Sequence, residues 1–172
     1  MSVSSLYVVN PYNDTHIQML NEYEKRNKMS TNLSEQLRQM VFSIPEEEYL
    51  KNKKNRNEIE ERLFLEKESM MIDSCLIQGE KDIKTGRISL SPKKGITKRR
   101  KIVSLAINYA LNTLNLEEVF IMIDPTDKET ITYLKQNGYE CLGEEQGNIL
   151  FLTEQEERIK NKRMIAWILL RI

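Results

Sequence analysis

The stretch of the sequence best suited to chemistry is a run of basic residues near the middle of the chain. Six of its nine consecutive positions are Lys93, Lys94, Lys98, Arg99, Arg100 and Lys101. The run lies between a predicted strand at 87–91 and a predicted helix at 98–114. A helix N-terminus is already electropositive, so cations there repel unless an anion lies nearby. The pattern is equally consistent with a phosphate-binding loop and with a solvent-exposed basic turn screened by salt.

The other chemistry-bearing residue types are scarce. Cys75 and Cys141 lack CxxC spacing and stand in apolar segments, which indicates small core residues. The single histidine, His16, is expected on a solvated helix face, with no catalytic partner nearby. No metal site is therefore predicted.

Length and charge exclude several classes of protein. At 172 residues the chain has the length of one domain. With 26 Lys and Arg against 26 Asp and Glu, it carries no net charge, which argues against nucleic-acid binding by bulk charge. The sequence shows no signal-peptide pattern and no apolar stretch long enough to span a membrane, so the cytoplasm is the simplest expected location.

Hydrophobic periodicity surrounds the basic run with alternating helices and strands. Helices are expected from Asn13 or Asp14 through Tyr23, over 33–44, over 98–114, and from Thr126 or Asp127 to 134. Strands are expected at 6–9, 63–65, 70–77, 87–91, 119–123, 139–142 and 149–152. The charged segment 46–62 is interpreted as a solvated helix or a loop, and 79–86 as a polar turn.

The order of these elements predicts the fold class. Three successive strands with polar turns indicate an antiparallel meander, and the helix at 98–114 would make strands 87–91 and 119–123 parallel neighbours. The prediction is an α/β fold of the α+β type, a mixed sheet with an antiparallel meander and helices on both faces. One domain is expected over 1–153, followed by a charged and apolar extension at 154–172.

Over about residues 5–153 the chain resembles the GCN5-related N-acetyltransferases, the GNAT family. Residues 124–139 resemble the family's strand-loop-helix segment that ends in Gly-Phe/Tyr, here Gly138-Tyr139. In that family a strand leads through an Arg/Gln-x-x-Gly-x-Gly/Ala loop into a long helix, and the loop amides hold the pyrophosphate of acetyl-CoA. The resemblance implies a GNAT-like acyl-CoA-binding domain that transfers an acetyl group to an amine of a small molecule or protein.

The resemblance also implies a site for acetyl-CoA. The backbone of the strand at 88–90 would pair with the pantetheine arm, and Lys94 takes the Arg/Gln position of the loop. Asp127 stands at the family's common asparagine. The implied cofactor-binding residues are Ile88, Ser89, Leu90, Lys94, Gly95, Ile96, Thr97, Lys98, Arg99 and Asp127.

Three departures from the family pattern leave a second interpretation open. Thr97 and Arg99 stand where the loop has small residues, and Leu134 stands at the frequent general-acid tyrosine. A glycine lets the backbone approach a phosphate closely, whereas these side chains add bulk. The alternative is a GNAT-like binding or regulatory module without catalysis.

Acetyl transfer, as the resemblance implies it, is direct attack of an amine on the thioester. A carboxylate or an ordered water must then accept the proton of the amine. Glu66, Glu68 and Asp73 are the carboxylate candidates, and Asp73 stands out because it interrupts the apolar run at 70–77. Either Tyr133 or Tyr139 would protonate the leaving thiolate. The predicted catalytic residues are Asp73, Glu68 and Tyr133.

The C-terminal segment is a separate feature. An apolar run, Met-Ile-Ala-Trp-Ile-Leu-Leu at 164–170, follows a charged stretch. The run is too short to span a bilayer. It is expected either to dock on the domain or to form an exposed patch for a partner subunit or a membrane surface, and a homodimer through it is one hypothesis.

Overall fold

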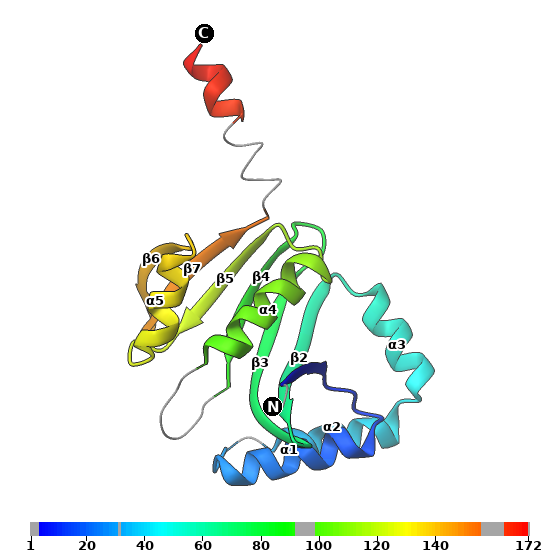
Figure 1. Ribbon diagram of the computed structural model, residues 1–172. Helices are drawn as coiled ribbons and strands as arrows, with labels where there is room; N and C mark the ends of the chain where they lie inside the picture. The colour runs from blue at the N-terminus through cyan, green and yellow to red at the C-terminus, as the bar shows by residue number, and fades with distance from the viewer. Residues whose placement is uncertain (1–3, 31, 92–98, 156–163, 172) are drawn as a thin grey trace.

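The computed structural model describes residues 4–30, 32–91, 99–155 and 164–171. A seven-stranded sheet with the order β1-β2-β3-β4-β5-β7-β6 forms its centre (Figure 1). The strands are β1 (Ser5–Val8), β2 (Glu58–Lys67), β3 (Met70–Glu80), β4 (Thr85–Leu90), β5 (Glu118–Ile123), β6 (Glu140–Glu145) and β7 (Asn148–Glu154). Among these strands β4 and β5 pair in parallel, and the other neighbours pair antiparallel.

Helices cover both faces of the sheet, as the sequence predicts. They are α1 (Asp14–Arg26), α2 (Leu33–Ser43), α3 (Glu46–Asn55), α4 (Arg100–Asn112) and α5 (Lys128–Gln136). The α4 and α5 side chains pack into one core cluster, and those of α1 and α2 pack into another. The predicted mixed sheet with an antiparallel meander is confirmed.

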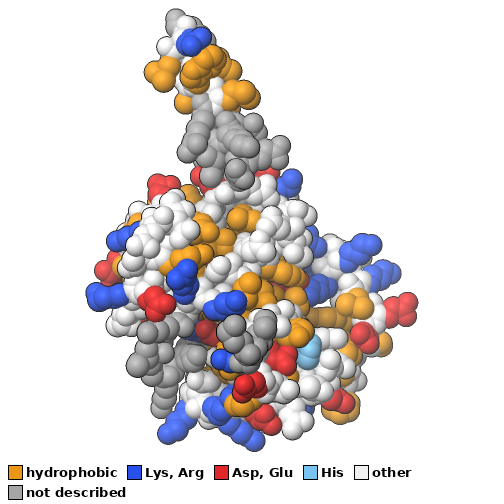
Figure 2. All heavy atoms as spheres, viewed as in Figure 1, with side chains coloured by type: hydrophobic (Ala, Val, Ile, Leu, Met, Phe, Trp, Pro, Cys, Tyr) orange, Lys and Arg blue, Asp and Glu red, His pale blue; other side chains and the backbone are white. Residues whose placement is uncertain are grey.

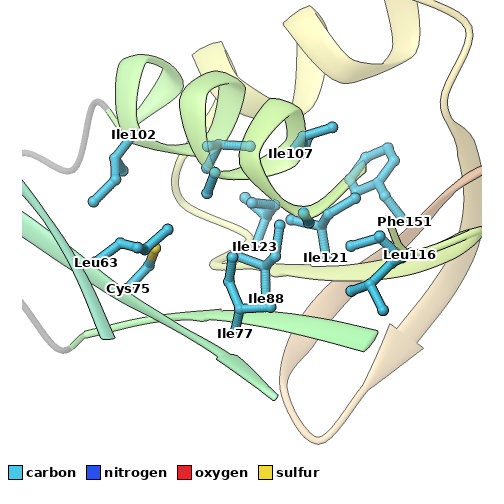
Figure 3. Close-up of a cluster of buried hydrophobic side chains, with 14 of the residues drawn as sticks. Leu63, Cys75, Ile77, Ile88, Ile102, Ile107, Leu116, Ile121, Ile123 and Phe151 are labelled. Carbon is cyan, nitrogen blue, oxygen red and sulfur yellow. The ribbon is translucent and has the colours of Figure 1, made fainter. Parts of the chain in front are cut away.

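The larger core lies between α4 and the sheet. Ile102, Ala106 and Ala110 recur at helical spacing on one face of α4, and all are fully buried against strand residues such as Ile77 and Ile121 (Figure 3). Burying one large apolar side chain stabilises a fold by about 1.5–3 kcal/mol. This packing fixes the position of the α4 N-terminus relative to the end of β4.

The second core holds α1 and α2 on the opposite face. Leu20 and Tyr23 of α1 pack with Phe64 of β2 and Met71 of β3. Tyr23 is 1 % exposed, so its hydroxyl needs a partner inside the protein. The partner is the Ser91 hydroxyl, so Tyr23 connects α1 to the end of β4.

Two strand boundaries differ from the sequence prediction. β2 begins at Glu58 rather than 63, because exposed Glu58 and Glu60 alternate with buried Ile59 and hide the strand in a charged run. The turn predicted at 79–86 is shorter, since Gly79 and Gly86 pair with each other across β3 and β4. The segment at 46–55 is the solvated helix α3, one of the two predicted alternatives.

Two predicted environments are also corrected. Cys75 is a core residue as expected, but Cys141 is exposed because β6 is the edge strand of the sheet. His16 is half-buried instead of solvated, with its ring edge-on to Phe64 at a centroid distance of 5.2 Å.

Residues 164–170 form a further short helix that lies apart from the sheet (Figure 1). Its large apolar side chains are all exposed, from 48 % at Ile168 to 87 % at Leu170. The expectation that this segment docks on the domain is therefore not met. The structure shows instead the other expected arrangement, an exposed apolar patch.

Candidate active site

The first turn of α4 contains no acidic residue, whereas the first turns of α1, α2, α3 and α5 each contain at least one. The N-cap residue of α4, Arg99, makes no side-chain capping bond, and the first turn contains Arg100 and Lys101. By contrast, Asn13 caps α1 and Asp127 caps α5. The first amides of α4 therefore have no capping oxygen from the described residues, and the dipole favours an anion there.

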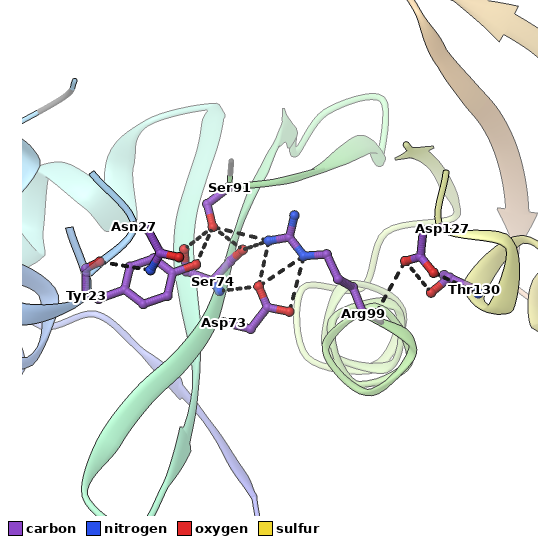
Figure 4. A network of polar contacts seen from close by, with 8 residues as sticks. All are labelled: Tyr23, Asn27, Asp73, Ser74, Ser91, Arg99, Asp127 and Thr130. Carbon is purple, nitrogen blue, oxygen red and sulfur yellow. Dashed lines mark hydrogen bonds and ion pairs between the residues drawn. The ribbon is translucent and has the colours of Figure 1, made fainter. Parts of the chain in front are cut away.

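Arg99 places its guanidinium inside the protein rather than at this helix end. Its Nη2 donates to Asp73 Oδ1 at 2.6 Å, and its Nε donates to both carboxylate oxygens at 3.2 and 3.3 Å (Figure 4). The two side chains are 7 % and 5 % exposed. Because the Asp73 side chain points toward α4 from β3, the pair joins the start of α4 to the centre of the sheet.

Asp127 makes a second connection to the start of α4. Its carboxylate accepts from the Thr130 amide at 3.2 Å and the Thr130 hydroxyl at 2.7 Å, which caps α5. The same carboxylate accepts from the Arg99 amide at 3.3 Å. One buried acidic side chain thus fixes the N-termini of α4 and α5 next to each other.

The polar network continues from Arg99 toward α1 through two serines. Ser91, just after β4, lies within hydrogen-bond distance of Ser74 Oγ at 2.7 Å, Tyr23 Oη at 2.9 Å and Arg99 Nη2 at 3.3 Å (Figure 4). Its own hydroxyl donates to the Ser74 carbonyl at 3.0 Å. The network therefore crosses from the α4 face to the α1 face where β4 ends.

The pairing of β4 changes at the same point. Ile88 and Ser89 lie in the ladder with β5, which ends at the Ser89–Met122 pair. The Ser91 amide donates to the Ser74 carbonyl at 3.1 Å, so the Ser91 backbone faces β3. Because neighbouring residues of a strand direct their backbone groups to opposite sides, those of Leu90 face β5, one residue beyond the end of that ladder.

A cavity of about 320 Å³ adjoins this network. It lies between α1 and α2 on one side and β2, β3 and β4 on the other. Most of its lining is apolar, including Leu20, Met29, Leu33 and Leu76, while Tyr23, Ser74 and Ser91 supply hydroxyl groups at one end. Its volume is at the lower end of the range for small-molecule sites.

Glu24 lines the cavity and caps α2 with its carboxylate. Its carboxylate is 6 % exposed and accepts from the Leu33 amide at 2.8 Å and the Ser34 amide at 3.0 Å. These are the first two amides of α2, whose N-cap Asn32 makes no side-chain capping bond. Glu24 therefore holds α2 against α1 and shapes the cavity.

Comparison with known proteins gives a structural match without a sequence match. No family model and no curated protein matches the sequence. The ribosomal-protein-S5-alanine acetyltransferase of Vibrio fischeri superposes with a TM-score of 0.62 at 14 % identity, over 91 % of this chain and 97 % of that chain. The N-acetyltransferase PseH of Campylobacter jejuni, solved with acetyl coenzyme A, superposes with a TM-score of 0.56 at 10 % identity, over 90 % of this chain and 100 % of that chain. A dodecameric spermidine N-acetyltransferase of Vibrio cholerae superposes with a TM-score of 0.55 at 15 % identity, over 92 % of this chain and 97 % of that chain.

The chain has the GNAT fold. In this fold the parallel β4–β5 pair and the long helix α4 correspond to the arrangement that the sequence resemblance implies. At these identities the match establishes the architecture, whereas the activity has to be argued from the site.

The GNAT fold brings only some of the predicted site residues together. Arg99, Asp127 and Asp73 meet at the start of α4, and Ser89 and Leu90 line the adjoining cavity. Lys94, Gly95, Ile96, Thr97 and Lys98 lie outside the described residues. Glu68 lies elsewhere, exposed in the tight turn between β2 and β3, with a φ of +52°.

Tyr133 lies on α5 beside the first two turns of α4. Its hydroxyl donates to Ser104 Oγ at 3.3 Å, and the Arg100 guanidinium lies 4.3 Å from the centre of its ring. This places the tyrosine next to the basic helix end. Tyr139, the alternative proton donor, is half-buried, and burial raises the pKa of its phenol.

Cys75 has the wrong environment for a nucleophile. Burial, with a smaller contribution from the Asp73 charge, raises the pKa of its thiol from 9.0 to about 12. The thiol therefore stays protonated at neutral pH. Within the described part of the chain, no group of His, Cys, Asp and Glu side chains is arranged to hold a metal ion.

Sequence reasoning missed Tyr23, Ser74, Ser91 and Glu24. The Tyr23–Ser91 contact joins positions 68 residues apart, so no local pattern announces it. One signal was accessible, however. Glu24 is a charged residue on the apolar stripe formed by Leu20 and Tyr23, where a carboxylate requires a partner.

Proposed function

We propose that this chain is an acetyl-CoA-dependent N-acetyltransferase and a GNAT family member. The observation that carries the proposal is the uncapped, basic N-terminus of α4 at the place where β4 and β5 stop pairing, within a GNAT fold. Acetyl-CoA supplies the acetyl group as a thioester.

The described residues fit the pyrophosphate of acetyl-CoA. The first amides of α4 point out of the helix end, and the side chains of Arg100 and Lys101 in the first turn are exposed. A doubly charged diphosphate satisfies both the amides and the cations. We assign Lys94, Gly95, Ile96, Thr97 and Lys98 to the same loop.

Arg99 and Asp127 act in this proposal as positioning residues. The guanidinium of Arg99 is held by Asp73, and its amide is held by Asp127. Both contacts fix the direction in which the α4 amides point. A helix end that is fixed before the ligand arrives loses less entropy on binding.

We propose that the two reactants bind on either side of Leu90. We assign the backbone of Ile88, Ser89 and Leu90 to the pantetheine arm, with Leu90 as its nearest contact beyond the β5 ladder. We assign the cavity to the acceptor amine, whose reacting end would lie near Ser91. Tyr133, beside the helix end, is the proposed proton donor to the thiolate.

The cavity also assists deprotonation of the amine. An ammonium group loses its proton more easily in an apolar site, because desolvation disfavours the charged form. Asp73 is engaged by Arg99, so an ordered water is the proposed proton acceptor. The volume of about 320 Å³ suits a small amine or a single terminal residue of a protein.

One observation favours a second candidate, a binding module without transfer. The best-placed carboxylate, Asp73, has both oxygens engaged by Arg99. Glu68 is an exposed turn residue and makes no contact with the network drawn in Figure 4. This candidate retains acetyl-CoA binding and lacks turnover.

Calorimetric titration with acetyl-CoA tests the binding part of the proposal. Lys101→Glu is expected to weaken binding roughly fivefold or more, because it places an acid beside the diphosphate. The matched control is Lys54→Glu, the same charge change at an exposed position of α3, which is expected to leave the affinity unchanged. Saturable binding that Lys101→Glu does not weaken would refute the site.

Release of free CoA in the presence of a panel of small primary amines tests the transfer part. Turnover supports the acetyltransferase. Binding without turnover for any amine, including an N-terminal alanine peptide and spermidine, selects the binding module. Absence of saturable binding at millimolar acetyl-CoA rejects both candidates.

A further inference from the structure

The short C-terminal helix, residues 164–170, has no role in the acetyl-transfer site. Met164, Ile165, Trp167, Ile168, Leu169 and Leu170 are each between 48 % and 87 % exposed. Figure 2 shows their apolar atoms grouped at the end of the molecule, away from the sheet. An exposed apolar group of this kind is normally covered by a partner or a membrane.

The distribution of apolar residues around the helix favours a lipid. Seven successive positions are apolar, so no polar face remains on this helix. A helix that packs on a protein surface has an apolar stripe and a polar remainder, whereas a helix that is apolar all round suits an environment apolar on several sides. A second copy of the helix would cover one stripe only.

The charges around the helix favour an anionic lipid. From Arg158 to Arg171 the sequence contains five Lys or Arg residues, namely Arg158, Lys160, Lys162, Arg163 and Arg171, and no Asp or Glu. The rest of the chain is correspondingly acidic, since the whole chain is neutral. Basic residues next to an apolar helix attract the negative head groups of a membrane surface.

Trp167 and Arg171 have the arrangement expected at a membrane surface. The Arg171 guanidinium lies 4.0 Å from the centre of the Trp167 ring. Tryptophan concentrates at the boundary between lipid tails and head groups, and arginine reaches from there to the phosphates. Within the described residues, no helix is long and apolar enough to cross a bilayer.

We propose that residues 164–170 form an interfacial helix that inserts its apolar side chains into the surface of an anionic membrane. At 1.5 Å per residue the helix is about 10 Å long, which fits the boundary region rather than the full hydrocarbon thickness. The partner is the lipid surface itself. The inference does not depend on the acetyl-transfer site.

The sequence provides a built-in reporter, because Trp167 is its only tryptophan. The full chain is titrated with vesicles of phosphatidylcholine mixed with phosphatidylserine, and with vesicles of phosphatidylcholine alone. We expect a blue shift of the tryptophan emission and co-sedimentation with the mixed vesicles. Binding to the neutral vesicles should be at least several-fold weaker, and added salt should weaken the mixed-vesicle binding.

Leu169→Glu is the test variant, since it places a charge in the middle of the apolar surface and touches no core residue. It is expected to reduce partitioning roughly tenfold or more while leaving the unfolding temperature unchanged. The matched control is Phe42→Glu on α2, because Phe42 is 92 % exposed and far from this helix in the chain. This variant should bind vesicles as the parent chain does.

Three results would overturn the proposal. The first is an unchanged tryptophan emission in the presence of the mixed vesicles. The second is equal loss of binding in Leu169→Glu and Phe42→Glu. The third is a blue-shifted emission without vesicles, together with a dimeric mass in analytical ultracentrifugation. If Leu169→Glu then restores a monomeric mass, the partner of the helix is a second copy of the chain.

Discussion

The buried pair of Arg99 and Asp73 makes the strongest quantitative prediction. Replacing Arg99 with Ala removes three short N–H···O contacts and leaves a carboxylate that is 5 % exposed without its cation. Removing one member of a buried ion pair costs about 3–5 kcal/mol, because the remaining charge is neither solvated nor paired. For a chain of this length that loss lowers the unfolding temperature by roughly 6–20 °C.

Two further variants separate charge from geometry. Arg99→Lys keeps the positive charge but loses the planar fork that reaches both oxygens of Asp73, so we expect an intermediate loss. Replacing Arg99 with Met and Asp73 with Leu together removes both charges. Because an apolar pair of similar size often matches a buried ion pair in stability, the double variant should recover most of the loss.

Urea unfolding, followed by circular dichroism, measures all three variants. The control is Arg38→Ala, because Arg38 and its partner Glu35 are 49 % and 48 % exposed and 3.9 Å apart. We expect the control to change the free energy of unfolding by less than about 1 kcal/mol. If Arg99→Ala loses no more stability than Arg38→Ala, the Arg99–Asp73 pair does not behave as a buried ion pair, and the reasoning is refuted.

Three further predictions concern individual residues. Glu24→Ala leaves two amides of α2 without their acceptor and should destabilise the chain by roughly 1–3 kcal/mol in urea unfolding, with a smaller loss for Glu24→Gln, which keeps one acceptor oxygen; equal losses would contradict the capping role. Burial lowers the pKa of His16 below its ordinary value of 6.5, so the unfolded chain takes up this proton at higher pH than the folded one. The contribution of neutral His16 to stability is complete above about pH 6.5 and is lost as the pH falls through the lowered pKa. The free energies of unfolding at pH 7.5 and at pH 5.5 should therefore differ less in His16→Gln than in the parent chain. Cys141 is exposed and Cys75 is buried with a thiol pKa of about 12, so a thiol reagent should modify one cysteine per native chain and two in denaturant; rapid modification of both in the native state would contradict the burial.

Local patterns in the sequence were enough to predict most of the elements and their order, with α3 left as either a helix or a loop. The helical spacing of Ile102, Ala106 and Ala110 identified α4, and Asp127 was identified as a candidate cap of α5. The apolar run at 119–123 indicated a strand, and the predicted parallel pairing of this strand with β4 is confirmed. These features depend on residues close together in the chain, so local patterns contain them.

The roles of the polar residues, in contrast, depend on contacts between elements that are distant in the chain. In the sequence Arg99 is one cation among six in the basic run, yet its guanidinium turns inward to Asp73, 26 residues away. Tyr23 and Ser91, 68 residues apart, meet because α1 packs on β3 where β4 ends. A buried charge or hydroxyl takes whichever partner the packing of distant elements brings to it, and no periodicity in the chain records that choice.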